Sequence, residues 1–86
     1  MVEVTRIRLF AAARHSVGRA EFGLEDLELT DPTTVSAVIE ALSAYSPSAR
    51  PVLEGCSVLV DGERRSGAGR VEGAQTVDLL PPFAGG

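Results

Sequence analysis

The 86-residue chain lacks, or nearly lacks, several residue types, and each shortage excludes a class of protein. It contains no lysine, no tryptophan and a single cysteine, Cys56. One cysteine excludes both an internal disulfide and a zinc site built from cysteines. One histidine, His15, excludes a metal cluster of several histidines and leaves little for a Ser/His/Asp triad. The sequence therefore predicts neither a bound metal nor a bound cofactor.

Long apolar runs and basic tracts are also missing. Without an apolar run of membrane-spanning length, we expect no membrane association. The first ten residues contain Glu3 and are not typical of a secretory signal, so we expect a cytoplasmic protein. A formal net charge of −4 without a basic tract predicts no nucleic-acid partner. The length fits one domain, and 44% hydrophobic with 23% charged residues is typical of a globular one.

Alternating or β-branched apolar residues predict five strands. In the first, Ile7 and Leu9 share one face and Phe10 lies on the other. In the second, the apolar phase changes midway, which favours a bulge. Asp61-Gly62 predicts a tight hairpin turn between the third and fourth strands. The predicted strands are residues 2–10, 21–30, 56–60, 63–66 and 76–80. Residues 11–19 are predicted as a connection and residues 46–55 as irregular.

One amphipathic helix is predicted between the second and third strands. Asp31 or Thr34 can cap its free amide groups, and Ser46-Pro47 ends it. Its apolar face consists of Val35, Val38, Ile39 and Leu42. A single helix can cover only one face of one mixed sheet. By analogy, this order of elements fits an α+β, ubiquitin-like β-grasp with the first and last strands parallel at the centre of the sheet. The domain would span residues 1–80 and an extended tail residues 81–86.

The tail is the least ordinary feature of the sequence. Pro81 and Pro82 favour an extended, stiff backbone that cannot continue a sheet. Gly85 and Gly86 leave the last two positions without side chains, so the backbone could enter a narrow channel. A frayed terminus is the ordinary alternative, but Phe83 would then be a costly exposed aromatic residue.

Four stretches of the sequence carry a resemblance to a known family. They are residues 9–14 (LFAAAR), 34–35 (TV), 56–62 (CSVLVDG) and 79–86 (LLPPFAGG). With these stretches the chain resembles the MoaD family, the small subunit of molybdopterin synthase, within the wider MoaD/ThiS group of sulfur carriers. The sequence departs from the family at Gly73-Ala74-Gln75, where Gly-Asp is common. The change removes an aspartate that could stabilise the turn.

The resemblance implies a carrier that performs no catalysis alone. An E1-like adenylating enzyme would use ATP and magnesium to activate the carboxylate of Gly86, and a sulfur donor protein would convert it to a thiocarboxylate. The tail would enter a channel of a MoaE-type large subunit, where the sulfur reaches cyclic pyranopterin monophosphate. The residues implied in that channel are Pro81, Pro82, Phe83, Ala84 and Gly85.

Three further residues are candidates for a partner interface. Phe10 and Leu80 are out of phase with the core residues of their strands, so both would lie on the helix-free face near the tail. The resemblance places both against the large subunit and Arg14 against the activating enzyme. Each has an ordinary alternative: a strand end tucked under a loop, or a surface arginine. We interpret Cys56 as a small buried residue rather than a sulfur relay.

Other functions remain open at this point. The carrier could serve thiazole, cysteine or natural-product sulfur supply. It could be a ubiquitin-like modifier whose Gly86 is joined to lysines of other proteins, although a chain without lysine cannot build side-chain-linked polymers of itself. It could also be a plain binding module.

Overall fold

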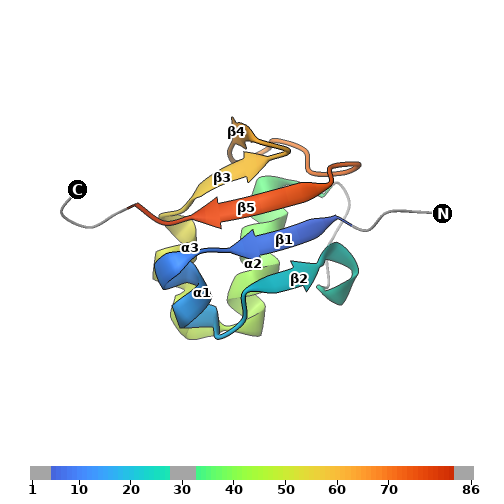
Figure 1. The fold of residues 1–86 in the computed structure, drawn as a ribbon. Coiled ribbons are helices and arrows are strands. Elements are labelled where there is room, and N and C mark those ends of the chain that lie inside the picture. The colour runs from blue at the N-terminus through green and yellow to red at the C-terminus, as the bar shows by residue number, and fades with distance from the viewer. Residues whose placement is uncertain (1–4, 28–32, 83–86) are drawn as a thin grey trace.

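A computed structural model describes residues 5–27 and 33–82. Its centre is a five-stranded mixed sheet in the order β2-β1-β5-β3-β4. In Figure 1, α2 crosses behind the sheet, while α1 and α3 lie at the end where β1 and β5 point. The elements are β1 (Arg6–Leu9), α1 (Ala11–Val17), β2 (Glu21–Gly23), η1 (Leu24–Asp26), α2 (Val35–Tyr45), η2 (Pro47–Ala49), α3 (Arg50–Glu54), β3 (Ser57–Val60), β4 (Glu63–Arg65) and β5 (Thr76–Leu80).

The two central strands confirm the predicted arrangement. β1 and β5 run parallel, with Ile7 opposite Val77 and Leu9 opposite Leu79. All four side chains are buried, whereas Arg6 and Arg8 of β1 are exposed. This alternation places one face of the sheet against the helices and leaves the other uncovered. The structure has the ubiquitin-like β-grasp arrangement that the order of elements predicted.

Helix α2 also follows its sequence signals. The Thr34 side chain accepts a hydrogen bond from the backbone N–H of Ala37 at 3.2 Å. Val35, Val38 and Leu42 are buried, and Ile39 packs partly buried against them. The helix ends at Tyr45, immediately before Ser46-Pro47. The alternative cap, Asp31, lies outside the described residues.

Residues 11–17, predicted as a connection, form the helix α1 instead. Ala13 and Val17, one turn apart, are buried on its inner side. Gly18 ends the helix in the left-handed conformation with φ of 84°, and its N–H bonds to the carbonyl of Arg14. The prediction took Gly18 as the mark of a loop, whereas it is the C-terminal cap of a short helix.

The segment between α2 and β3, predicted as irregular, is also helical. It contains the 3₁₀ turn η2 and the five-residue helix α3. Proline lies in the first turn of each, where the missing N–H costs nothing. Ala49 and Leu53 are fully buried and attach the segment to the core.

The second strand is shorter than predicted, and the prediction of a bulge within it is wrong. β2 ends at Gly23, and residues 24–26 turn as the 3₁₀ helix η1. The carboxylate of Asp26 accepts a hydrogen bond from the N–H of Gly23 at 2.8 Å, which closes this turn. The change of apolar phase therefore marks the end of a strand. Residues 28–30 of the predicted strand lie outside the described residues.

The predicted hairpin turn is present between β3 and β4. Asp61 and Gly62 both have positive φ, 50° and 84°, as a two-residue turn of this hand requires. The Oδ1 atom of Asp61 also accepts hydrogen bonds from the N–H groups of Gln75 and Thr76, at 2.8 and 3.0 Å. Asp61 thus stabilises the 73–75 turn, where the chain departs from the family pattern.

Candidate functional site

The tail begins at the centre of the sheet. β5 is hydrogen-bonded to β1 on one side and to β3 on the other, and it ends at Leu80. Pro81 is buried and Pro82 is exposed. The remaining tail residues of the prediction, Phe83 to Gly86, lie outside the described residues. The point of departure is therefore held by two strand ladders, immediately before the residues that the resemblance places in a partner channel.

The uncovered side of the sheet is the surface next to this point. We define the open face as the side chains on the sheet opposite the helices, with Phe10 at its end. The register of the strands assigns to it Arg6, Arg8, Phe10, Glu21, Ser57, Leu59, Arg64, Thr76, Asp78 and Leu80.

Phe10 and Leu80 lie where the sequence predicted them. The Phe10 N–H bonds to the carbonyl of Leu79 at 3.2 Å and extends the pairing one residue beyond β1. Since Leu9 is opposite Leu79, Phe10 and Leu80 are neighbours on the open face. Phe10 is 40% exposed, whereas Leu80 is half-buried. An apolar pair therefore borders the start of the tail, and its role as an interface stays a prediction.

An ion pair that the sequence reasoning missed lies beside this apolar pair. The guanidinium of Arg8 donates two hydrogen bonds to the carboxylate of Asp78, at 2.6 and 2.9 Å. The hydrogen bond to Asp78 raises the pKa of Arg8 above its usual value. The same guanidinium lies 6.0 Å from the centre of the Phe10 ring. The sequence signal for this ion pair was that Arg8 and Asp78 have opposite charges and lie on the same face of the two central strands.

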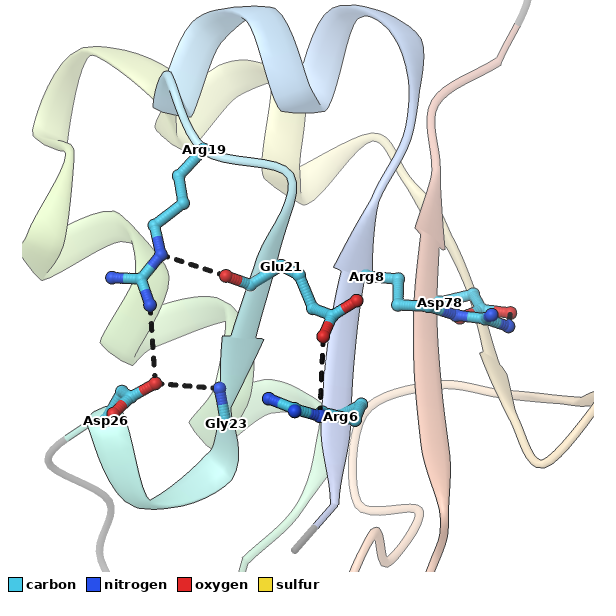
Figure 2. Close-up of polar contacts among 7 residues, drawn as sticks. All are labelled: Arg6, Arg8, Arg19, Glu21, Gly23, Asp26 and Asp78. Atoms are coloured by element: carbon cyan, nitrogen blue, oxygen red, sulfur yellow. Dashed lines mark hydrogen bonds and ion pairs between the residues drawn. The ribbon is translucent and has the colours of Figure 1, made fainter.

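Figure 2 shows the polar contacts of β1 and its neighbours. Arg6 on β1 forms an ion pair with Glu21 on the edge strand β2, with 3.3 Å between Nε and Oε1. Arg19 and Asp26 form a separate contact around the end of β2 at 3.4 Å. These contacts pair the arginines of β1 and of the turn before β2 with carboxylates, and the apolar pair lies at the end of the sheet.

Arg14 and His15 are exposed on α1, one turn after Phe10. Arg14 forms no ion pair with any described residue. Its predicted contact with an activating enzyme is therefore sterically open, and it stays a prediction.

Cys56 lies near the same end of the sheet, because the next residue, Ser57, pairs with Leu80. Its Sγ donates a hydrogen bond to the carbonyl of Val52 at 3.3 Å. Burial raises the pKa of this thiol to about 11, so the thiol is neutral at physiological pH. A neutral thiol is a poor nucleophile, which favours the interpretation of Cys56 as a packing residue.

Within residues 5–27 and 33–82, no three His, Cys, Asp or Glu side chains are arranged to hold a metal ion. None of the helices in that same part of the chain has the length and apolarity to cross a membrane. The candidate site consists of the open face and the start of the tail at Pro81-Pro82.

Comparison with known proteins supplies a family. The model of the ThiS family matches residues 7–86. No curated protein matches the chain significantly. Among solved structures, small archaeal modifier protein 1 of Haloferax volcanii superposes with a TM-score of 0.75 at 21% identity, covering 95% of this chain and 98% of that one.

Two further structures share the fold. A candidate subunit 1 of molybdopterin converting factor from Pyrococcus furiosus has a TM-score of 0.74 at 20% identity, covering 95% of this chain and all (100%) of that one. The HVO 2177 protein of Haloferax volcanii has a TM-score of 0.71 at 25% identity, covering 98% of this chain and 87% of that one. These likenesses confirm the β-grasp fold.

Proposed function

Because the chain belongs to the ThiS family, we propose that it is a sulfur carrier that acts as the small subunit of a molybdopterin synthase. Gly86 would carry the sulfur as a thiocarboxylate and deliver it to cyclic pyranopterin monophosphate. One observation supports this role above the others. The central strand β5 leads directly into Pro81-Pro82, beside the apolar pair of the exposed Phe10 and the half-buried Leu80.

The chemistry at Gly86 needs activation, because a free carboxylate is a poor electrophile. In the proposed first step, a carboxylate oxygen attacks the α-phosphorus of ATP and pyrophosphate leaves. The resulting acyl adenylate carries a good leaving group. The terminal sulfur of a persulfide on the donor protein would then attack the acyl carbon, and AMP would depart, leaving an acyl disulfide. A second thiol would cleave its S–S bond, forming a disulfide with the donor cysteine and releasing the thiocarboxylate. The activating enzyme supplies ATP, magnesium and the catalytic groups for these steps.

The described residues of this chain contribute position rather than catalysis. β5 is fixed by ladders on both sides, so Pro81 has a defined place relative to the open face. Phe10 and Leu80 would dock on the large subunit, and the tail would extend from there into its channel. Binding through the folded domain would thus bring the thiocarboxylate to the acceptor in one orientation.

Reconstitution tests the proposal directly. The full chain would be incubated with an E1-like adenylating enzyme, ATP, magnesium, a sulfur donor and a MoaE-type large subunit. Intact-mass analysis should show one oxygen exchanged for sulfur, and the large subunit should then convert cyclic pyranopterin monophosphate. A chain that gains no sulfur, or whose thiocarboxylate transfers none to this acceptor, would refute the proposal.

Variants of the tail test the need for a free carboxylate separately from the need for the correct length. Extending the chain beyond Gly86 turns the carboxylate into an amide, so we expect no thiocarboxylate. Deleting Gly86 keeps a carboxylate but shortens the reach by roughly 3.5 Å. Since a misplacement of about 1 Å can cost on the order of a hundredfold in rate, product formation should nearly vanish. Gly85→Val keeps the length and tests the width of the channel.

The second candidate is a ubiquitin-like protein modifier. The similarity in fold to small archaeal modifier protein 1 favours it, because the activated terminus would serve both purposes. The two functions predict different products in cells. A modifier leaves Gly86 in an isopeptide bond with lysines of other proteins, whereas a carrier returns to the free carboxylate. Mass spectrometry of branched tryptic peptides distinguishes them.

A further inference from the structure

The charges of the open face differ from those of the whole chain. The chain has a net charge of −4, yet the described residues of the open face include three arginines and two carboxylates. Arg6 is paired with Glu21, and Arg8 is paired with Asp78. Among the described residues of the open face, Arg64 is the cation that has no ion-pair partner. An acidic protein thus presents a surplus positive charge on its uncovered sheet face.

Ion pairing within the described residues is otherwise nearly complete. Six of the eight arginines form ion pairs with carboxylates, and within residues 5–27 and 33–82 Arg14 and Arg64 alone form none. Asp61, in the turn just before β4, engages its Oδ1 with two backbone amides. The neighbouring Arg65 pairs with Glu63. Among the described residues, Arg64 is therefore left without an ion-pair partner, whereas most of the other arginines are paired.

The register places Arg64 beside apolar surface. It lies directly opposite Leu59 in the β3–β4 ladder, and Leu59 lies opposite Asp78. Opposed residues of an antiparallel pair project to the same face. Leu59 is half-buried and Arg64 is exposed. An arginine at the rim of a half-exposed apolar surface is typical of protein interfaces.

We propose that the open face contacts its partner protein at a second point, where Arg64 pairs with a carboxylate of that partner beside Leu59. This inference rests on the proposed function, and the partner is the large subunit. The contact lies on the β4 side of the sheet, whereas Phe10, Leu80 and the tail lie at the end of the central strands. Two separated contacts fix the rotation of the domain, which a single apolar contact leaves free.

Affinity measurements with matched variants test the contact. R64Q and R70Q each remove one positive charge, but Arg70 lies in a loop and pairs with Glu72 at 2.6 Å. At low salt, R64Q should weaken binding to the large subunit about two- to fivefold, mainly in the association rate, and should lower its salt dependence. R70Q should bind as the wild type does. R64K should keep most of the affinity.

Chemical coupling detects direct contact between two side chains, which a change in net charge alone cannot produce. The chain has no lysine, so R64K supplies its only side-chain amine. A water-soluble carbodiimide would then join that amine to a carboxylate in direct contact with it. Peptide mapping should find an amide between position 64 and an acidic residue of the large subunit. R70K should give no such product.

The outcomes separate this inference from the proposed function. Wild-type protein that gains and delivers sulfur while R64Q binds as tightly as wild type would overturn the contact and leave the function standing. Equal weakening by R64Q and R70Q, or no coupling through R64K, would overturn it as well. Failure of the wild-type chain to bind the large subunit would refute both.

Discussion

Whether sulfur travels on the Gly86 carboxylate or on a thiol can be decided at Cys56. Burial raises the pKa of this thiol from 9.0 to about 11. At pH 7 the thiolate fraction is then about one in ten thousand, against about one in a hundred for the unshifted group. The bond from Sγ to the carbonyl of Val52 also holds the proton in place. We therefore expect Cys56 to react slowly and to take no part in sulfur transfer.

Two measurements check this expectation. Alkylation of the folded chain by iodoacetamide at pH 7 should be about a hundredfold slower than alkylation of the chain unfolded in urea, because only the thiolate reacts. The rate should rise steadily with pH toward about 11. In the reconstituted system, Cys56→Ala should be thiocarboxylated at the wild-type rate and should lose only about 1 kcal/mol of stability.

The pH dependence of stability follows from the same shift. The folded state binds the thiol proton more tightly than the unfolded state does, because burial disfavours the thiolate. The contribution of Cys56 is therefore complete below pH 9.0 and declines as the pH rises from 9.0 to about 11. The difference in melting temperature between wild type and Cys56→Ala should shrink over that range. Fast labelling at pH 7, or loss of thiocarboxylate in folded Cys56→Ala, would refute the reasoning.

Two further predictions concern the open face and the hairpin turn. Phe10→Asp and Leu80→Asp should each weaken binding to the large subunit about tenfold or more while the melting temperature changes little, because neither side chain is fully buried. As a control, Leu79→Asp changes a fully buried position and should unfold the domain. Equal unfolding of all three variants would show that Phe10 and Leu80 are core residues instead. Asp61→Ala should cost about 1–3 kcal/mol in urea denaturation, since two backbone amides lose their acceptor. Asp61→Asn, which keeps an oxygen and tolerates positive φ, should cost clearly less; equal losses would contradict this account.

The parts of the fold that were predicted are those with strong local signals. α2 has a side-chain cap, an apolar face of four residues and a proline at its end, so its limits were predicted closely. α1 and α3 have only seven and five residues, and each inserts few apolar side chains into the core. Helices this short are unstable alone and form because the tertiary structure buries them. Their sequence signals, Gly18 and Pro51, are also typical of loops.

The residues of the candidate site also divide into those with a local sequence signal and those without one. Phe10 and Leu80 could be assigned to the open face because the period of each strand determines the face of every residue. The Arg8–Asp78 ion pair could not be assigned with the same ease, since it depends on the register between strands that lie 70 residues apart in the sequence. Arg64, Arg65 and Arg70 are all exposed, and their sequence positions alone do not distinguish Arg64 from the other two. Only the ladder with β3 distinguishes it, by placing it opposite Leu59.

The parallel pairing of β1 and β5 connects these features. Because both strands point to the same end of the sheet, the residue after β1 and the end of β5 meet there. A backbone hydrogen bond from the N–H of Phe10 to the carbonyl of Leu79 consequently holds Phe10 beside the end of β5. Leu80, the residue before Pro81, is itself paired with Ser57 in the β3–β5 ladder. Under the proposed function, the number of residues after Pro81 would set the distance from the docking surface to Gly86. We therefore expect that a change in that number alters delivery of sulfur without altering the fold.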